Sequence, residues 1–230
     1  MSHSTISLGL GLGGGKSATS SGSPGGGGAY SNSTSVLFDG TNDSMQLGSQ
    51  IEFTGAFTFS IWAHPLSGNE GFISASDMDS GGPWLSWYGA AYGNKWVLSR
   101  MGSIAGTAGY ATSGSWYHIV VIRDGSNVVK MYVDGSQQGS NSSFTGTAKF
   151  LMFAARNASG GGALNGYLDE IAFWDSDQTS NLAAMSDSGA AADLSGLSPT
   201  HWYRMGDING SFGVTINNQG SGGSNDGTLT

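Results

Sequence analysis

The order of apolar and polar residues between positions 114 and 139 predicts a β-hairpin. Two runs rich in β-branched and aromatic residues, 116–123 and 128–133, flank the tetrad DGSN at 124–127. Asp and Asn tolerate left-handed backbone angles and glycine has no Cβ, so tetrads of this composition close hairpins. A second Asp-Gly pair at 134–135 turns the chain again. This stretch identifies the chain as antiparallel β.

The second run of this hairpin has the period of a half-buried strand. Val129, Met131 and Val133 fall on one face of an extended chain, and Lys130 and Tyr132 fall on the other. Successive side chains of a strand point to opposite faces, so the three apolar residues are expected in the core.

Short strands separated by turn signals continue along most of the remaining sequence. Examples are SVLFDG, FTFSIWAHP, KWVLSRM, KFLMFAARN and GYLDEIAFWD. Phe57, Phe59 and Ile61 alternate with polar or bulky residues, as expected of one core-facing side. Two facing sheets that share one core are the natural packing for such a series. The predicted fold class is all-β: a two-sheet antiparallel jelly-roll sandwich.

The sequence divides into an arm and a sandwich, with one short helix in the latter. Residues 1–33 form a Gly/Ser-rich N-terminal arm and linker, and residues 34–230 form the sandwich. Within 176–194, Leu182 and Met185 are an i, i+3 pair that predicts a short helix, which we expect to cover only a sheet edge.

The N-terminal arm carries a strand signal in an otherwise featureless segment. Ile6, Leu8, Leu10 and Leu12 alternate with polar or glycine residues. Such a segment can add a strand to another protein and so act as a tether. The alternative is an idle tail.

Charge and composition narrow the classes of partner. The chain has 8 basic and 16 acidic residues and a net charge of −8, which argues against nucleic acid. It has no run of about 18 apolar residues, so no membrane insertion is expected. Cysteine is absent. An acidic surface suits neutral sugars or calcium better than anionic partners.

Several motifs together resemble a known group of folds. They are FDGTNDSMQL, FTFSIWAHP, the WYH motif at 116–118 ahead of YVDG at 132–135, and GYLDE at 166–170. Their order is similar to that of the laminin G-like group of concanavalin A-type jelly rolls, over roughly residues 35–182. In composition, with a Gly-rich arm before an acidic, Gly-rich body, the chain also resembles sandwich domains on tailed-bacteriophage virion surfaces. Fold carries many functions, so function has to be argued from sites.

The acidic residues do not form the pattern of a glycan hydrolase. Glycanases of this fold carry an E-x-D-x-E strand whose acids share one face. Here Asp169 and Glu170 are adjacent and are expected to point to opposite faces, and their i+2 partners are apolar. We expect no enzymatic activity.

Calcium is the one cofactor that the sequence suggests. The turn 39–43 offers carboxylate and carbonyl oxygens suited to a hard cation. The resemblance implies a structural calcium ion between this turn and a late acidic strand, with Asp39, Asn42 and Asp169 as candidate ligands. The alternative is a turn in which the Asp side chain binds backbone amides.

Residues 84–96 are the richest in candidate sugar contacts. Carbohydrate sites combine exposed aromatic rings with hydrogen-bonding side chains. Alternate residues of the strand face opposite ways, so one set is core and the other is free. The candidate sugar contacts in this segment are Trp84, Trp87, Tyr88, Tyr92 and Asn94.

These observations support two functional hypotheses. The first is a non-enzymatic virion structural protein, such as a head decoration, fibre or tail adhesion component. It would attach to other virion proteins through its arm, bind host-surface glycans, and act in multiple copies or as a homo-oligomer. The second is a secreted, extracellular carbohydrate-binding module or lectin-like adhesin.

Overall fold

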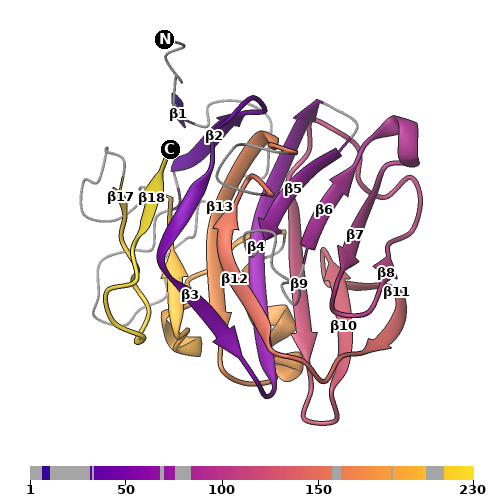
Figure 1. Ribbon diagram of the computed structural model, residues 1–230, viewed down its shortest axis with the longest axis vertical. Coiled ribbons are helices and arrows are strands. Elements are labelled where there is room, and N and C mark those ends of the chain that lie inside the picture. The colour runs from indigo at the N-terminus through magenta and orange to yellow at the C-terminus, as the bar shows by residue number, and fades with distance from the viewer. Residues whose placement is uncertain are drawn as a thin grey trace.

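The computed structural model describes residues 7–10, 32, 34–67, 70–75, 84–156, 162–187, 189–205 and 215–230. These residues form two large antiparallel sheets packed face to face (Figure 1). Among them, no helix is long and apolar enough to cross a membrane. The predicted all-β sandwich is confirmed.

Sheet A is the one that lies behind in Figure 1. From edge to edge its strands are β1 (Ser7–Leu10), β2 (Thr34–Asp39), β13 (Asn165–Trp174), β4 (Phe57–Ser67), β9 (Tyr117–Arg123), β10 (Val128–Val133) and β11 (Ser136–Ser143), and β16 (His201–Tyr203) also pairs with β13.

Sheet B faces it across the core. Its order is β17 (Thr215–Ile216), β18 (Gly227–Leu229), β3 (Met45–Phe53), β12 (Ala148–Phe153), β5 (Glu70–Ala75), β6 (Trp84–Tyr88), β7 (Lys95–Ser99) and β8 (Ile104–Ala105). A small separate sheet joins β14 (Ser186–Asp187) to β15 (Ala190–Ala191).

The hairpin expected between 116 and 133 is formed by β9 and β10. Asp124 Oδ1 accepts hydrogen bonds from the backbone amides of Ser126 and Val128, at 2.9 and 3.0 Å. Asn127 has a φ of 62°, the left-handed conformation that Asn tolerates. Val129 and Met131 are fully buried, as their alternation predicted.

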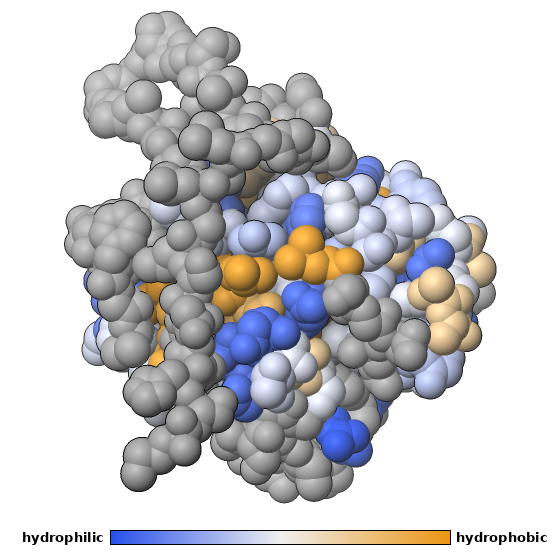
Figure 2. All heavy atoms as spheres, turned by 90° about the horizontal axis from the view of Figure 1, so that it is seen from above, coloured by the Kyte–Doolittle hydropathy of each residue, from blue (hydrophilic) through white to orange (hydrophobic). Residues whose placement is uncertain are grey.

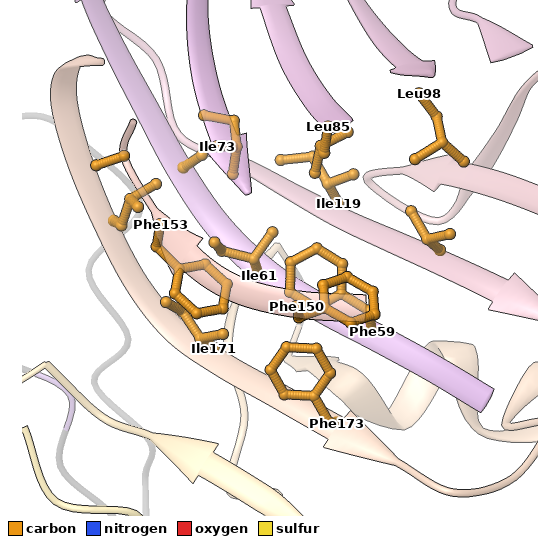
Figure 3. Close-up of a cluster of buried hydrophobic side chains, with 14 of the residues drawn as sticks. Phe59, Ile61, Ile73, Leu85, Leu98, Ile119, Phe150, Phe153, Ile171 and Phe173 are labelled. Carbon is orange, nitrogen blue, oxygen red and sulfur yellow. The ribbon is translucent and has the colours of Figure 1, made fainter. Parts of the chain in front are cut away.

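The main core lies between the two sheets and is dominated by phenylalanine. Figure 3 shows Phe59 and Phe173 from sheet A meeting Phe150 from sheet B. Their ring centroids lie 4.9 to 5.1 Å apart. Each aromatic pair adds about 0.5–1.5 kcal/mol beyond the burial of its area. This packing fixes the sheets on which the surface loops are mounted.

A second, smaller core covers the outer face of sheet A. Residues 175–200 contain two short 3-10 helices, η2 (Thr179–Met185) and η3 (Ser195–Leu197), and pack across that face. The buried residues of this second core are Val120, Ile122, Tyr132, Ala172, Trp174, Met185, Leu194 and Trp202. The expected short helix is therefore present, but it covers a sheet face rather than an edge.

A β-bulge in β13 overturns the expectation that Asp169 and Glu170 point to opposite faces. The pairing with β4 shifts register between Asp169 and Ala172, and Glu170 has a φ of 46°. A bulge inserts one extra residue and re-aims the side chains around it. Glu170 therefore contacts Trp202, which belongs to the second core on the outer face of sheet A. The alternation of β13 places the side chain of Asp169 on that same face. Both carboxylates lie on the outer side of sheet A.

The strand signal of the arm corresponds to β1. Residues 7–10 pair antiparallel with β2 of the same chain, with Leu8 opposite Val36. The rest of the arm, residues 1–6, 11–31 and 33, lies outside the described residues.

Candidate functional site

The candidate site is built on the turn between β6 and β7, two strands of sheet B next to its edge strand β8. Strand β6 ends at Tyr88, the short 3-10 helix η1 (Ala90–Tyr92) follows, and β7 begins at Lys95. Gly93 ends η1 with a φ of 88°, a conformation that costs glycine little because it has no Cβ. The turn therefore brings Tyr92 back beside Tyr88.

Backbone hydrogen bonds hold this turn to the neighbouring loop, residues 106–116. The amide of Gly109 donates to the carbonyl of Gly93 at 2.8 Å, and that of Ala111 donates to Asn94 at 3.0 Å. Within the turn, the amides of Tyr92 and Asn94 both donate to the carbonyl of Gly89 at 3.0 Å. A turn fixed in this way has little backbone conformational entropy left to lose on binding.

Tyr92 is the most exposed large apolar side chain in the described part of the protein. It is 54% exposed, and its ring meets that of Tyr88 edge to face, with centroids 5.4 Å apart and planes at 83°. Tyr110, on the loop bonded to this turn, is 38% exposed. Tyrosine offers an apolar ring face and a polar hydroxyl, which is the combination that sugar binding uses.

Trp87 is a correction to the candidate set, because it lies in the core. It is 2% exposed, and its Nε1 donates a hydrogen bond to the carbonyl of Ala111 at 2.6 Å. Its role is to fix the loop behind the tyrosines. Asn94 is half-buried beside Tyr92. Trp84 begins β6, and its side chain lies outside the described residues.

A second group of aromatic rings lies on the outer face of sheet A, at the end where β4 finishes. His64, Trp116 and Tyr167 form a cluster with ring centroids 5.3 to 6.2 Å apart. All three are half-buried, and burial lowers the pKa of His64 below its ordinary 6.5. In the sequence, these residues stand out only as structural positions or as parts of the family motifs. The signal that could have found them is their alternation with the core residues of their strands.

Within the described residues, the arrangement nearest to a nucleophile and base is inaccessible. Ser60 Oγ lies 2.7 Å from His118 Nε2, and both residues are buried on sheet A. His118 also stacks on Trp62, with ring centroids 5.0 Å apart. A substrate cannot reach this hydroxyl without displacing the structure around it, so the pair is a structural hydrogen bond.

The three candidate calcium ligands are not brought together. Asp39 pairs with Asn165 on β13, whereas Asp169 lies four residues further along that strand, about 13 Å away at the usual rise per residue. Asp39 Oδ1 accepts from the amide of Thr41 at 2.8 Å, which is the alternative Asp turn. Asn42 is exposed within the turn. These donors do not fit one calcium ion.

The fold defines a concanavalin A-like jelly roll, and the sequence places the chain within it. A laminin G family model, described as the concanavalin A-like lectin/glucanases superfamily, matches residues 39–181. The chain belongs to this family, which confirms the resemblance. No curated protein sequence matches the chain.

Two solved structures illustrate the likeness. A Bacteroides ovatus ATCC 8483 protein with an assumed carbohydrate-binding role has a TM-score of 0.65 and 16% identity. The match covers 85% of this chain and 57% of that protein, so this chain spans little more than half its length. Domain 4 of a Geobacillus stearothermophilus GH43 extracellular arabinanase, solved with arabinotriose, has a TM-score of 0.48 and 19% identity, over 69% of this chain and 82% of that one. At these identities the likeness shows the fold alone.

Proposed function

We propose that this protein is a non-enzymatic carbohydrate-binding domain whose principal contact is Tyr92. The observation that carries the proposal is an exposed tyrosine, Tyr92, that packs edge to face on half-buried Tyr88, on a turn fixed by backbone hydrogen bonds. A ring already held in place can stack on the apolar face of a sugar without a large ordering cost. The assumed carbohydrate-binding role of the Bacteroides ovatus protein agrees with this proposal.

The ligand class follows from charge. The net charge of −8 disfavours anionic glycans by long-range repulsion, so the expected ligand is a neutral sugar. Tyr88 and Tyr92 supply phenolic hydroxyls, and Asn94 supplies an amide beside them. These groups hydrogen-bond to sugar hydroxyls, which gives the site its specificity.

The setting that we propose is a virion surface, where the arm attaches each copy to other virion proteins. Many weak sites on one particle gain effective concentration from the shared scaffold, so modest affinity per copy is sufficient for adhesion. The alternative is a secreted module that acts alone. Deletion of residues 1–33 separates these two settings. A virion protein anchored by the arm would no longer be incorporated into particles, whereas a secreted module would bind glycans as before.

A glycan array with purified protein tests the proposed binding. Wild-type protein is expected to bind neutral glycans, and Tyr92→Ala is expected to lose that binding. Lys149→Ala is the matched control, because Lys149 pairs with Glu52 at the end of the sandwich opposite Tyr92. Circular dichroism confirms that each variant is folded. Unchanged binding by folded Tyr92→Ala would overturn the assignment of the site.

A further inference from the structure

The two aromatic groups described above lie at the two ends of one loop. The loop of residues 106–116 leaves β8 at the edge of sheet B and enters β9 in sheet A. Tyr110 lies near its start, on the side bonded to the Tyr92 turn. Trp116 lies at its end, in the ring cluster with His64 and Tyr167. The loop thus runs from the turn that carries Tyr92 to the outer face of sheet A.

Hydrogen bonds hold the loop along its length, so the two ring groups keep a fixed separation. Besides its bonds to the Tyr92 turn, the amide of Thr112 donates to the Tyr117 hydroxyl at 3.0 Å. The amide of Gly114 donates to the carbonyl of Pro65 at 2.7 Å, which ties the loop to β4. These anchors lie on both sheets, and the loop is part of the rigid frame.

Between the ring groups the loop exposes hydroxyl groups. Ser113 and Ser115 are exposed, and Gly114 between them adds no side chain. The Thr112 hydroxyl forms a hydrogen bond with the Tyr117 hydroxyl at 3.1 Å. Figure 2 looks onto this end of the sandwich, where hydrophilic surface and smaller hydrophobic patches alternate. Leu66, at the end of β4, is 36% exposed there. The order along the loop is therefore ring, hydroxyls, ring.

We propose that the carbohydrate site extends along this loop and binds an internal stretch of a linear neutral oligosaccharide rather than a single terminal sugar. Each sugar unit has an apolar ring face and a polar rim, which matches stacking at both ends and hydrogen bonding between them. The six residue steps from Tyr110 to Trp116 limit their backbone separation to about 20 Å at 3.3–3.6 Å each, so the bound stretch is a short one. The inference rests on the proposed function and adds its substrate class.

Affinity as a function of glycan length tests the extension. The probe is a series from monosaccharide upward of the neutral glycan that binds best on the array, titrated by calorimetry. Wild-type affinity is expected to rise with length and then level off. Trp116→Ala is expected to bind the monosaccharide as wild type does, but to lose about tenfold in affinity for the longest member, equivalent to one good contact. Lys149→Ala is expected to match wild type throughout.

The outcomes separate this inference from the proposed function. If folded Trp116→Ala keeps the full length dependence while Tyr92→Ala loses binding, the extension is wrong and the Tyr92 site stands. If wild-type protein binds no glycan of any length, both are wrong. Should Trp116→Ala fail to fold, Ser113→Arg at an exposed loop position decides the question. A flat length dependence in that variant supports the extension, and wild-type behaviour overturns it.

Discussion

Arg204 Nε donates a hydrogen bond to Glu170 Oε1 across 3.1 Å, and both side chains are buried on the outer side of sheet A. The other carboxylate oxygen, Oε2, accepts from Trp202 Nε1 at 2.5 Å. The Arg204 guanidinium also lies over the Trp202 ring, 5.1 Å from its centroid. Glu170 sits at the β-bulge of β13, so this carboxylate joins the bulge to the end of β16.

Loss of this carboxylate should destabilise the fold strongly. Glu170→Ala leaves a buried guanidinium and an indole N–H without this partner, which costs about 3–5 kcal/mol in the free energy of unfolding. The measurement is urea denaturation followed by tryptophan fluorescence. Glu52→Ala, which removes the half-exposed partner of Lys149 at 3.8 Å, is the control and should cost less than about 1 kcal/mol. Equal losses in the two variants would contradict the structural role of Glu170.

Arg123 is predicted to be irreplaceable by lysine. Its guanidinium is fully buried and donates to the carbonyls of Gly55, Gly146 and Phe53, with Nε–O and Nη1–O distances of 2.6 Å to the first two. Lysine is a single point donor and cannot reach three separate acceptors. We expect Arg123→Lys to lower the free energy of unfolding by about 1.5–3 kcal/mol. A loss below the error of the urea titration would show that these contacts contribute little.

Stability should fall as pH falls below neutrality, partly through His64. Burial lowers the pKa of His64, and that of His201, below 6.5. As the pH falls, these side chains therefore take up protons in the unfolded chain before they do so in the folded protein. The stabilising contribution is therefore complete above pH 6.5 and is lost as pH falls through the folded-state pKa. His64→Gln should show a shallower decline of unfolding free energy between about pH 7 and pH 5 than wild type. Identical slopes would exclude His64 as a contributor.

Calcium is predicted to have no structural role at the turn 39–43. Asp39, at the end of β2, pairs with Asn165, four residues before Asp169 on β13, and the Asp39 carboxylate already binds the amide of Thr41. The melting temperature should therefore be the same with EDTA and with millimolar calcium. A rise with calcium that Asp39→Asn abolishes would restore the calcium site that the family resemblance implies.

Local features of the structure were predictable from sequence, whereas those that depend on distant contacts were not. The β9–β10 hairpin depends on neighbouring residues only, namely the turn tetrad and the alternation of Val129 and Met131. The positions of Asp169 and Glu170 depend on a bulge, which simple alternation cannot express. The packing of residues 175–200 over sheet A depends on Trp174 and Trp202, which are far apart in sequence.

The candidate site shows the same division. Tyr92 follows a strand in a glycine-rich turn, so its exposure could be expected from sequence. Trp87 belongs to β6, in which each of the two faces carries at least one aromatic residue. The alternation alone therefore does not say which face lies in the core. The approach of Trp116 to Tyr167 arises from the pairing of β9 and β13 with opposite edges of β4, a relationship between strands that are distant in the chain.

Calorimetric titration of a neutral glycan into wild-type protein and into Tyr92→Ala tests the central claim most directly. The account predicts saturable binding at one site per wild-type chain, and binding too weak to measure in the folded variant. Saturable binding of equal affinity by both proteins, or by neither, would contradict it.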